Sequence, residues 1–196
     1  MPYRKMVETS PQFIHSQLVD DVTLADRVVE FFNAHPYLHA EGLVVDGDGV
    51  DSSKIKKSRE IYVGNQLVSF PVFQEFNQQL EIALKEYLRI YPRVDTLSRF
   101  SLMPYNIQFY KPEEGYFDWH CEITSGLKPY VNRVLVFTFY CNTLEDGGTE
   151  FLHQDFTCKS EKGKLCIFPT SWTFTHRGEF CTKGKMIVTG WWNFEV

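Results

Sequence analysis

The spacing of apolar residues along the chain changes near residue 98, and this change constrains the fold more than any other feature of the sequence. From there on, short apolar and aromatic runs alternate with turn signals rich in Gly, Pro and Asp. The runs span residues 106–111, 133–142, 148–152, 164–168, 172–176 and 185–194. Several short strands at this spacing predict an all-β sandwich or barrel.

Upstream of residue 98 the pattern is helical. Thr23 with Asp26 predicts a capping box, and apolar residues then recur at helical spacing from Leu24 to Phe32 before Pro36 ends the run. A longer helix is predicted from Pro71 to Tyr91, with one apolar stripe along it. The Gly-, Asp-, Ser- and Lys-rich residues 44–60 are interpreted as a loop. The expected architecture is therefore mainly β, with N-terminal helices packed on the strands.

The size of the chain suits one domain over residues 1–196, with residues 1–97 as a helical support region and 98–196 as the β core. Five cysteines without a CxxC pair argue against a disulfide framework and favour reduced thiols. Neither a signal peptide nor a membrane-spanning run is recognisable, so a cytoplasmic protein without membrane contact is expected.

Charge gives little indication of a nucleic-acid partner. The net charge is −5 and the pI about 5.7, which is not the electrostatic signature of nucleic-acid binding. One basic run, residues 54–59, is interpreted as a solvated loop, and a patch for an acidic substrate is the alternative. No nucleic-acid partner is expected.

The candidate metal site begins with His120 and Glu122. If this stretch is a strand, alternate side chains share one face, and both residues point the same way. A lone His-x-Glu pair is a weak signal, but His176, at the end of the predicted strand 172–176, supplies a second imidazole. Two His and one carboxylate on one face of an ion leave three positions open, as in non-heme Fe(II) oxygenases. No Ser-His-Asp or Cys-His arrangement suggests another chemistry.

Further pieces of the C-terminal half accompany these three residues in a fixed order. They are Gln108-Phe109-Tyr110 followed by Gly115 and Tyr116; the run 133–142; Gly147-Gly148 with Phe151; Gly163 with Phe168-Pro169; and Lys185 nine residues after His176, with Trp191 six residues later. Residues from about 98 to 196 thereby resemble the prolyl 4-hydroxylase-like branch of the 2-oxoglutarate/Fe(II) oxygenases.

The resemblance implies a double-stranded β-helix (jelly-roll, cupin-like) core, and a dioxygenase whose cofactors are Fe(II) and 2-oxoglutarate, with O2 as co-substrate. It implies that His120, Glu122 and His176 are the catalytic metal ligands. Lys185 would bind the distal carboxylate of 2-oxoglutarate, with further pocket residues expected at Tyr110, Tyr140, Thr138 and Trp191. Arg177 is a candidate for contact with the metal ligands or the substrate.

The carboxylate ligand departs from the family pattern, which usually has Asp at this position. Glu122 retains the carboxylate, so a halogenase-type site, which needs that position vacated, is disfavoured. The extra methylene must be absorbed by a shift of the backbone or of the side-chain rotamer.

The substrate is expected to contact loops near residues 44–62 and 113–130. Lys185 in place of Arg favours the collagen-type and microbial prolyl hydroxylases, and thus hydroxylation of a prolyl residue in a protein or peptide. The alternatives are hydroxylation of a free amino acid or other small molecule, a cupin-like metal enzyme that does not use 2-oxoglutarate, and a non-catalytic binding module with the same fold.

Overall fold

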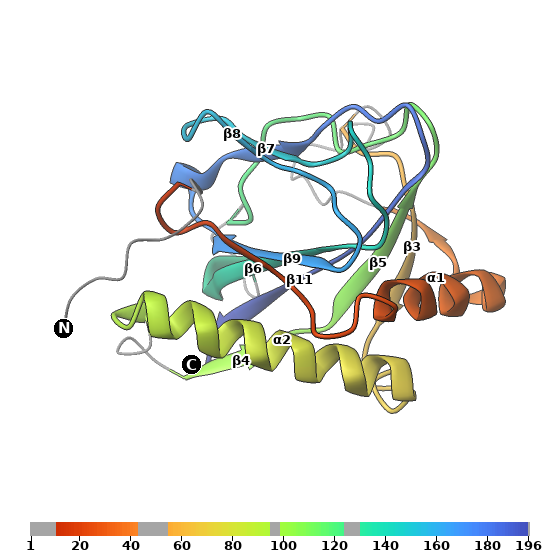
Figure 1. Ribbon diagram of the computed structural model, residues 1–196, viewed down its shortest axis with the longest axis horizontal. Coiled ribbons are helices and arrows are strands. Elements are labelled where there is room, and N and C mark those ends of the chain that lie inside the picture. The colour runs from red at the N-terminus through yellow and green to blue at the C-terminus, as the bar shows by residue number, and fades with distance from the viewer. Residues whose placement is uncertain (1–10, 43–54, 95–98, 124–129, 196) are drawn as a thin grey trace.

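A computed structural model of the protein describes residues 11–42, 55–94, 99–123 and 130–195. Two antiparallel sheets and two long helices make up the described chain (Figure 1). The helices are α1 (Leu24–Ala34) and α2 (Pro71–Ile90), and short 3-10 turns span Pro36–Leu38, Tyr130–Asn132 and Trp172–Phe174.

The larger sheet has the strand order β1-β9-β6-β11-β5-β3-β2, and β4 also pairs with β11. Its strands are β1 (His15–Leu18), β2 (Ala40–Glu41), β3 (Arg59–Val63), β4 (Phe100–Leu102), β5 (Tyr105–Tyr110), β6 (Arg133–Tyr140), β9 (Lys164–Pro169) and β11 (Lys185–Phe194). The smaller sheet has the order β10-β7-β8, from β7 (Thr149–Phe151), β8 (Phe156–Cys158) and β10 (His176–Gly178). Together the two sheets form the expected double-stranded β-helix.

Alternation along the strands gives the large sheet two different faces. On β11, Met186, Val188 and Trp192 belong to the core beneath the helices, whereas Lys185 and Trp191 line a cavity on the opposite face. A strand turns successive side chains to opposite sides, so one sequence serves both the helix-packed core and the cavity.

The helices cover one side of the large sheet, and the small sheet lies on the other (Figure 1). The apolar stripe of α2, including Phe73, Phe76, Leu80 and Tyr87, is buried in that helix-side core, as expected from its spacing. A second apolar cluster lies on the other face and joins the two sheets. It contains Ile14, Val136, Tyr140, Phe151, Cys158, Cys166, Phe168 and Phe174.

Several expectations are wrong in detail. Thr23 precedes α1, but its hydroxyl donates to Asp21 at 2.7 Å and forms no capping box with Asp26. The run 172–176 is not a strand: it forms a 3-10 turn, and the strand begins only at His176. The stretch around His120 is not a regular strand either, since only an isolated β-bridge is formed there.

The first third of the chain contributes more than helices. Strands β1, β2 and β3 all precede residue 97 and join the large sheet. The single domain over 1–196 and its division at residue 97 stay predictions.

All five cysteines are free thiols. Among the described residues, no helix is both long and apolar enough to cross a membrane.

Candidate metal centre

Backbone pairing, and not strand alternation, brings the three candidate ligands together. His120 and His176 form a β-bridge: the His120 N–H donates to the His176 carbonyl at 3.0 Å, and the His176 N–H donates back at 2.8 Å. The Glu122 N–H donates to the carbonyl of Thr170 at 3.1 Å. The irregular segment that carries His120 and Glu122 is thus fastened to β10 and to the end of β9.

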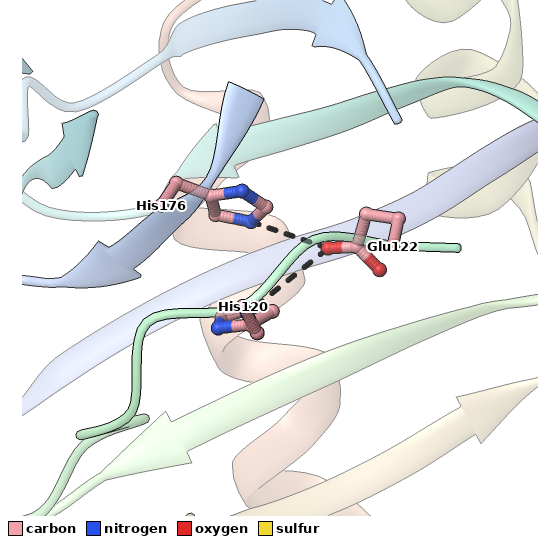
Figure 2. Close-up of side chains that lie close together, drawn as sticks. All are labelled: His120, Glu122 and His176. Atoms are coloured by element: carbon pink, nitrogen blue, oxygen red, sulfur yellow. Dashed lines mark ion pairs between the residues drawn. The ribbon is translucent and has the colours of Figure 1, made fainter. Parts of the chain in front are cut away.

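The three side chains converge, as Figure 2 shows. Their ligand atoms lie within 4.8 Å of one another. Oε1 of Glu122 is 3.2 Å from Nε2 of His176 and 3.9 Å from Nε2 of His120. Two imidazole nitrogens and one carboxylate oxygen facing a common point are a donor set that suits a divalent transition metal.

Both imidazoles are held in the tautomer that a metal ligand needs. Nδ1 of His120 lies 2.9 Å from the carbonyl oxygen of Asp118, and Nδ1 of His176 lies 2.9 Å from that of Phe174. A carbonyl oxygen only accepts, so each Nδ1 carries the proton and each Nε2 keeps its lone pair for the shared point. The His120 ring also stacks on Tyr116, with centroids 3.6 Å apart.

Burial and charge favour the binding-competent protonation states. Burial, together with repulsion from His176, lowers the pKa of His120 to about 4. Burial alone would raise the pKa of Glu122, but the neighbouring imidazoles of His176 and His120 and the guanidinium of Arg133 favour the ionised carboxylate and bring this pKa down to about 2. At neutral pH the site therefore presents a neutral His120 imidazole and an ionised carboxylate.

The second oxygen of Glu122 has its own partners. The Trp191 indole Nε1–H donates to Oε2 at 2.8 Å, and Nη1 of Arg133 lies 3.3 Å from the same oxygen. Trp191 was expected only as a pocket residue, and Arg133 was not expected at the site. The one available signal was a cation at the start of the otherwise apolar run 133–142.

Lys185 lies in the same cavity. Its side chain is almost fully buried, with the ammonium group 5.2 Å from the centroid of the Tyr110 ring. Within the described ranges, no carboxylate pairs with this ammonium group and no acceptor hydrogen-bonds to it. Burial lowers the pKa of Lys185, since a charge without a partner is costly in such a place. Gly178 makes room for it: a Cβ there would lie 3.0 Å from Nζ.

The other expected pocket residues line this cavity of about 390 Å³ together with the three ligands and Lys185. Tyr110 donates its hydroxyl to Oε1 of Gln108 at 2.7 Å. The Tyr140 hydroxyl is 2.8 Å from the Thr149 hydroxyl, and Thr138 lies on the same strand two residues earlier. Both tyrosine hydroxyls thus have protein partners already.

Charged residues near the rim are paired within the protein. Nε of Arg177 donates to Glu150 at 2.6 Å, and its guanidinium lies over the ring of Trp119. In the basic run, Lys56 is buried and forms an ion pair with Glu60, which overturns the interpretation of the whole run as a solvated loop. Residues 44–54 and 124–129, parts of the two expected substrate loops, lie outside the described residues.

Comparisons with known proteins agree with this geometry. Residues 105–193 match the model of the 2OG-Fe(II) oxygenase superfamily. A search of curated protein sequences gave no match.

Many solved structures share the fold, and three of them illustrate the similarity. The viral collagen prolyl hydroxylase of Paramecium Bursaria Chlorella virus-1 is 14% identical, with a TM-score of 0.65 over 94% of this chain and 97% of that one. A Pseudomonas putida prolyl-4-hydroxylase is 13% identical, with a TM-score of 0.65 over 94% of each chain. A Trichoplax adhaerens prolyl hydroxylase, in complex with a hypoxia inducible factor peptide fragment, is 11% identical, with a TM-score of 0.71 over 93% and 84%.

Proposed function

We propose that this chain, which carries a 2OG-Fe(II) oxygenase domain at residues 105–193, hydroxylates a prolyl residue in a protein or peptide. The domain makes it a 2-oxoglutarate-dependent dioxygenase whose cofactors are Fe(II) and 2-oxoglutarate. The observation that carries the proposal is the convergence of His120, Glu122 and His176 in a cavity that also contains the unpaired ammonium group of Lys185.

The three convergent residues would hold the metal. The site supplies the neutral imidazole and ionised carboxylate that Fe(II) requires, and both Nδ1 atoms are already engaged with carbonyl oxygens. When bound, Fe(II) supplies the chemistry that inserts one oxygen atom of O2 into a substrate C–H bond while 2-oxoglutarate becomes succinate and CO2.

Lys185 would bind the distal carboxylate of 2-oxoglutarate. A buried cation without a counterion is stabilised by an anion placed beside it, and such charge-assisted hydrogen bonds are stronger than neutral ones. Tyr110, Tyr140 and Thr138 would form the walls that orient the chain of the keto acid between this ammonium group and the metal.

The substrate class rests on the solved relatives. The three solved structures named above are described as prolyl hydroxylases, and one of them is in complex with a peptide fragment. A peptide substrate would reach the metal through this cavity, whose lining includes Tyr116 and Tyr130. A free amino acid or other small molecule is the competing substrate class.

A direct test of the site is anaerobic titration with Fe(II) and 2-oxoglutarate. The visible absorption of the iron–keto acid chelate is expected for the natural protein. It should be lost in Lys185→Ala and retained in Lys183→Ala, a matched control because Lys183 is exposed two residues earlier on the chain. Absence of the absorption from the natural protein would contradict the cofactor site.

The substrate is tested separately with a panel of proline-containing peptides and free amino acids under turnover conditions. Mass spectrometry should find the gain of one oxygen atom on prolyl residues of peptides. Oxidation of free amino acids alone would favour the small-molecule alternative. Absence of any oxidised product from a protein that forms the chelate would contradict the proposed substrate class.

A further inference from the structure

We propose that Arg133 and Trp191 are positioning residues that hold one oxygen of Glu122, so that only the other oxygen is offered to the metal. This proposal rests on the metal site proposed above. The two carboxylate oxygens have different surroundings: Oε1 faces Nε2 of His176 at 3.2 Å and Nε2 of His120 at 3.9 Å. Oε2 receives the Trp191 indole proton at 2.8 Å and lies 3.3 Å from Nη1 of Arg133.

Arg133 and Trp191, called the clamp from here on, contact both the backbone and the side chain of Glu122. The same Nη1 of Arg133 that approaches Oε2 also donates to the Glu122 backbone carbonyl at 3.0 Å. The Glu122 N–H is bound to the carbonyl of Thr170. The backbone and the carboxylate of Glu122 are therefore held by the same neighbouring residues, although the segment forms no regular strand. These contacts restrain the additional side-chain torsion that Glu has relative to Asp.

Arg133 is itself immobilised. Its guanidinium lies 3.7 Å from the centroid of a Trp191 ring and 4.8 Å from that of Tyr130, which are distances of a cation–π contact. Its side chain is 12% exposed, and among the described carboxylates only Glu122 forms an ion pair with it. Arg133 and Trp191 thus support each other while both point at one oxygen of Glu122.

The consequence concerns the open positions on the metal. A carboxylate with two free oxygens can bind an ion through both, whereas a keto acid and O2 together need three positions. A long, flexible Glu is more prone to such two-oxygen binding than Asp. Engaging Oε2 with two donors leaves Oε1 as the ligand and keeps the remaining positions available to the cosubstrates.

The test uses Co(II) in place of iron and needs no turnover, because the visible absorption of bound Co(II) reports its affinity and coordination number. Trp191→Phe keeps the ring beneath Arg133 but removes the indole proton. Its matched control is Trp192→Phe, the same change on the opposite, helix-packed face of β11. Arg133→Met removes the charge and the N–H donors of the guanidinium group but keeps a side chain of similar length.

Trp191→Phe and Arg133→Met are expected to lower Co(II) affinity by about 10- to 100-fold and to change the Co(II) spectrum. Binding of 2-oxoglutarate to the Co(II)-loaded protein should weaken as well, whereas Trp192→Phe should match the natural protein in all three measurements. Unchanged affinity and spectrum in both clamp variants would overturn the proposal. Failure of the natural protein to bind Co(II) would instead overturn the metal site.

A double-mutant cycle with Glu122→Asp separates positioning from general destabilisation. The shorter Asp side chain is not expected to reach both the metal and the clamp, so Trp191→Phe should have little further effect on Co(II) affinity in that background. Equal losses in the Glu122 and Asp backgrounds would show that Trp191 acts independently of the carboxylate and would overturn the clamp.

Discussion

The two ends of the cavity differ in how completely the protein satisfies their polar groups. At the metal end, the protein supplies partners for every polar atom that does not face the metal position. These atoms are Nδ1 of His120, Nδ1 of His176 and Oε2 of Glu122. At the other end, no described carboxylate lies within ion-pair distance of the Lys185 ammonium group, and Glu179 and Asp146 act on it only through longer-range electrostatic attraction. The metal end is organised in advance, whereas the lysine end holds a buried ammonium group that has no ion-pair partner among the described residues and that an anionic ligand would neutralise.

The supporting structure also differs. Lys185 and Tyr110 stand on regular strands and face each other in the register of β11 and β5. His120 and Glu122 stand on an irregular segment that depends on backbone hydrogen bonds to His176 and Thr170 and on the side chains of Arg133 and Trp191. Substitutions at the lysine end should therefore leave the fold intact. Substitutions at the metal end should disturb both the local structure and metal binding.

The largest expected effect is the loss of the metal end itself. His176→Ala removes one of three convergent donors and should abolish Co(II) and Fe(II) binding, measured by titration and by the loss of metal-induced thermal stabilisation. His153→Ala, at an exposed position near the same small sheet, is the control and should bind metal as the natural protein does. Unimpaired binding by His176→Ala would refute the assigned ligand set.

The lysine end should respond in two opposite directions. Lys185→Met should weaken 2-oxoglutarate binding by about 100-fold, because a charge-assisted contact is lost. The protein without ligands should become more stable, since a buried and unpaired ammonium group is replaced by an apolar chain of similar length. Calorimetry and ligand titration on the same variant test both signs, and a drop in ligand-free stability would contradict this account of Lys185.

Removing the clamp should give the contrasting result in the ligand-free protein. Arg133→Met leaves the buried Glu122 carboxylate with fewer partners, so the free energy of unfolding should fall by about 2 kcal/mol. Chemical denaturation measures the change. A stability equal to or above that of the natural protein would remove the proposed difference between the two ends.

The smallest expected effect is at Tyr140. Its hydroxyl already has a partner in Thr149, so Tyr140→Phe should weaken 2-oxoglutarate affinity by less than about 10-fold. Titration of the metal-loaded variant tests this value. A loss as large as that of Lys185→Met would mean that Tyr140 binds the ligand directly.

Much of the scaffold could be predicted from local pattern. The helix from Pro71 was expected to extend to Tyr91 and ends at Ile90, and the run 185–194 is the strand β11. These elements have a clear period and clear end signals, which act over neighbouring residues. The run 172–176 has neither a clear period nor clear end signals, because a short aromatic run is compatible with either a strand or a turn.

The site could be predicted only in part. His120, Glu122 and His176 were selected by residue type and by family resemblance, and they do converge, but the strand expected to align the first two is not formed. Arg133 was missed because nothing in its sequence neighbourhood relates it to Glu122. That relation arises when the segment carrying Glu122 is fastened to Thr170.

The sequence by itself determined the alternation of β11 and the stripe of α2, because both follow from the geometry of a single backbone element and the burial of apolar side chains. Only the tertiary structure decided which oxygen of Glu122 faces the imidazoles and why Lys185 forms no ion pair with a described carboxylate. Both depend on groups far apart in the chain, whose distances are set by sheet register and by backbone hydrogen bonds between irregular segments.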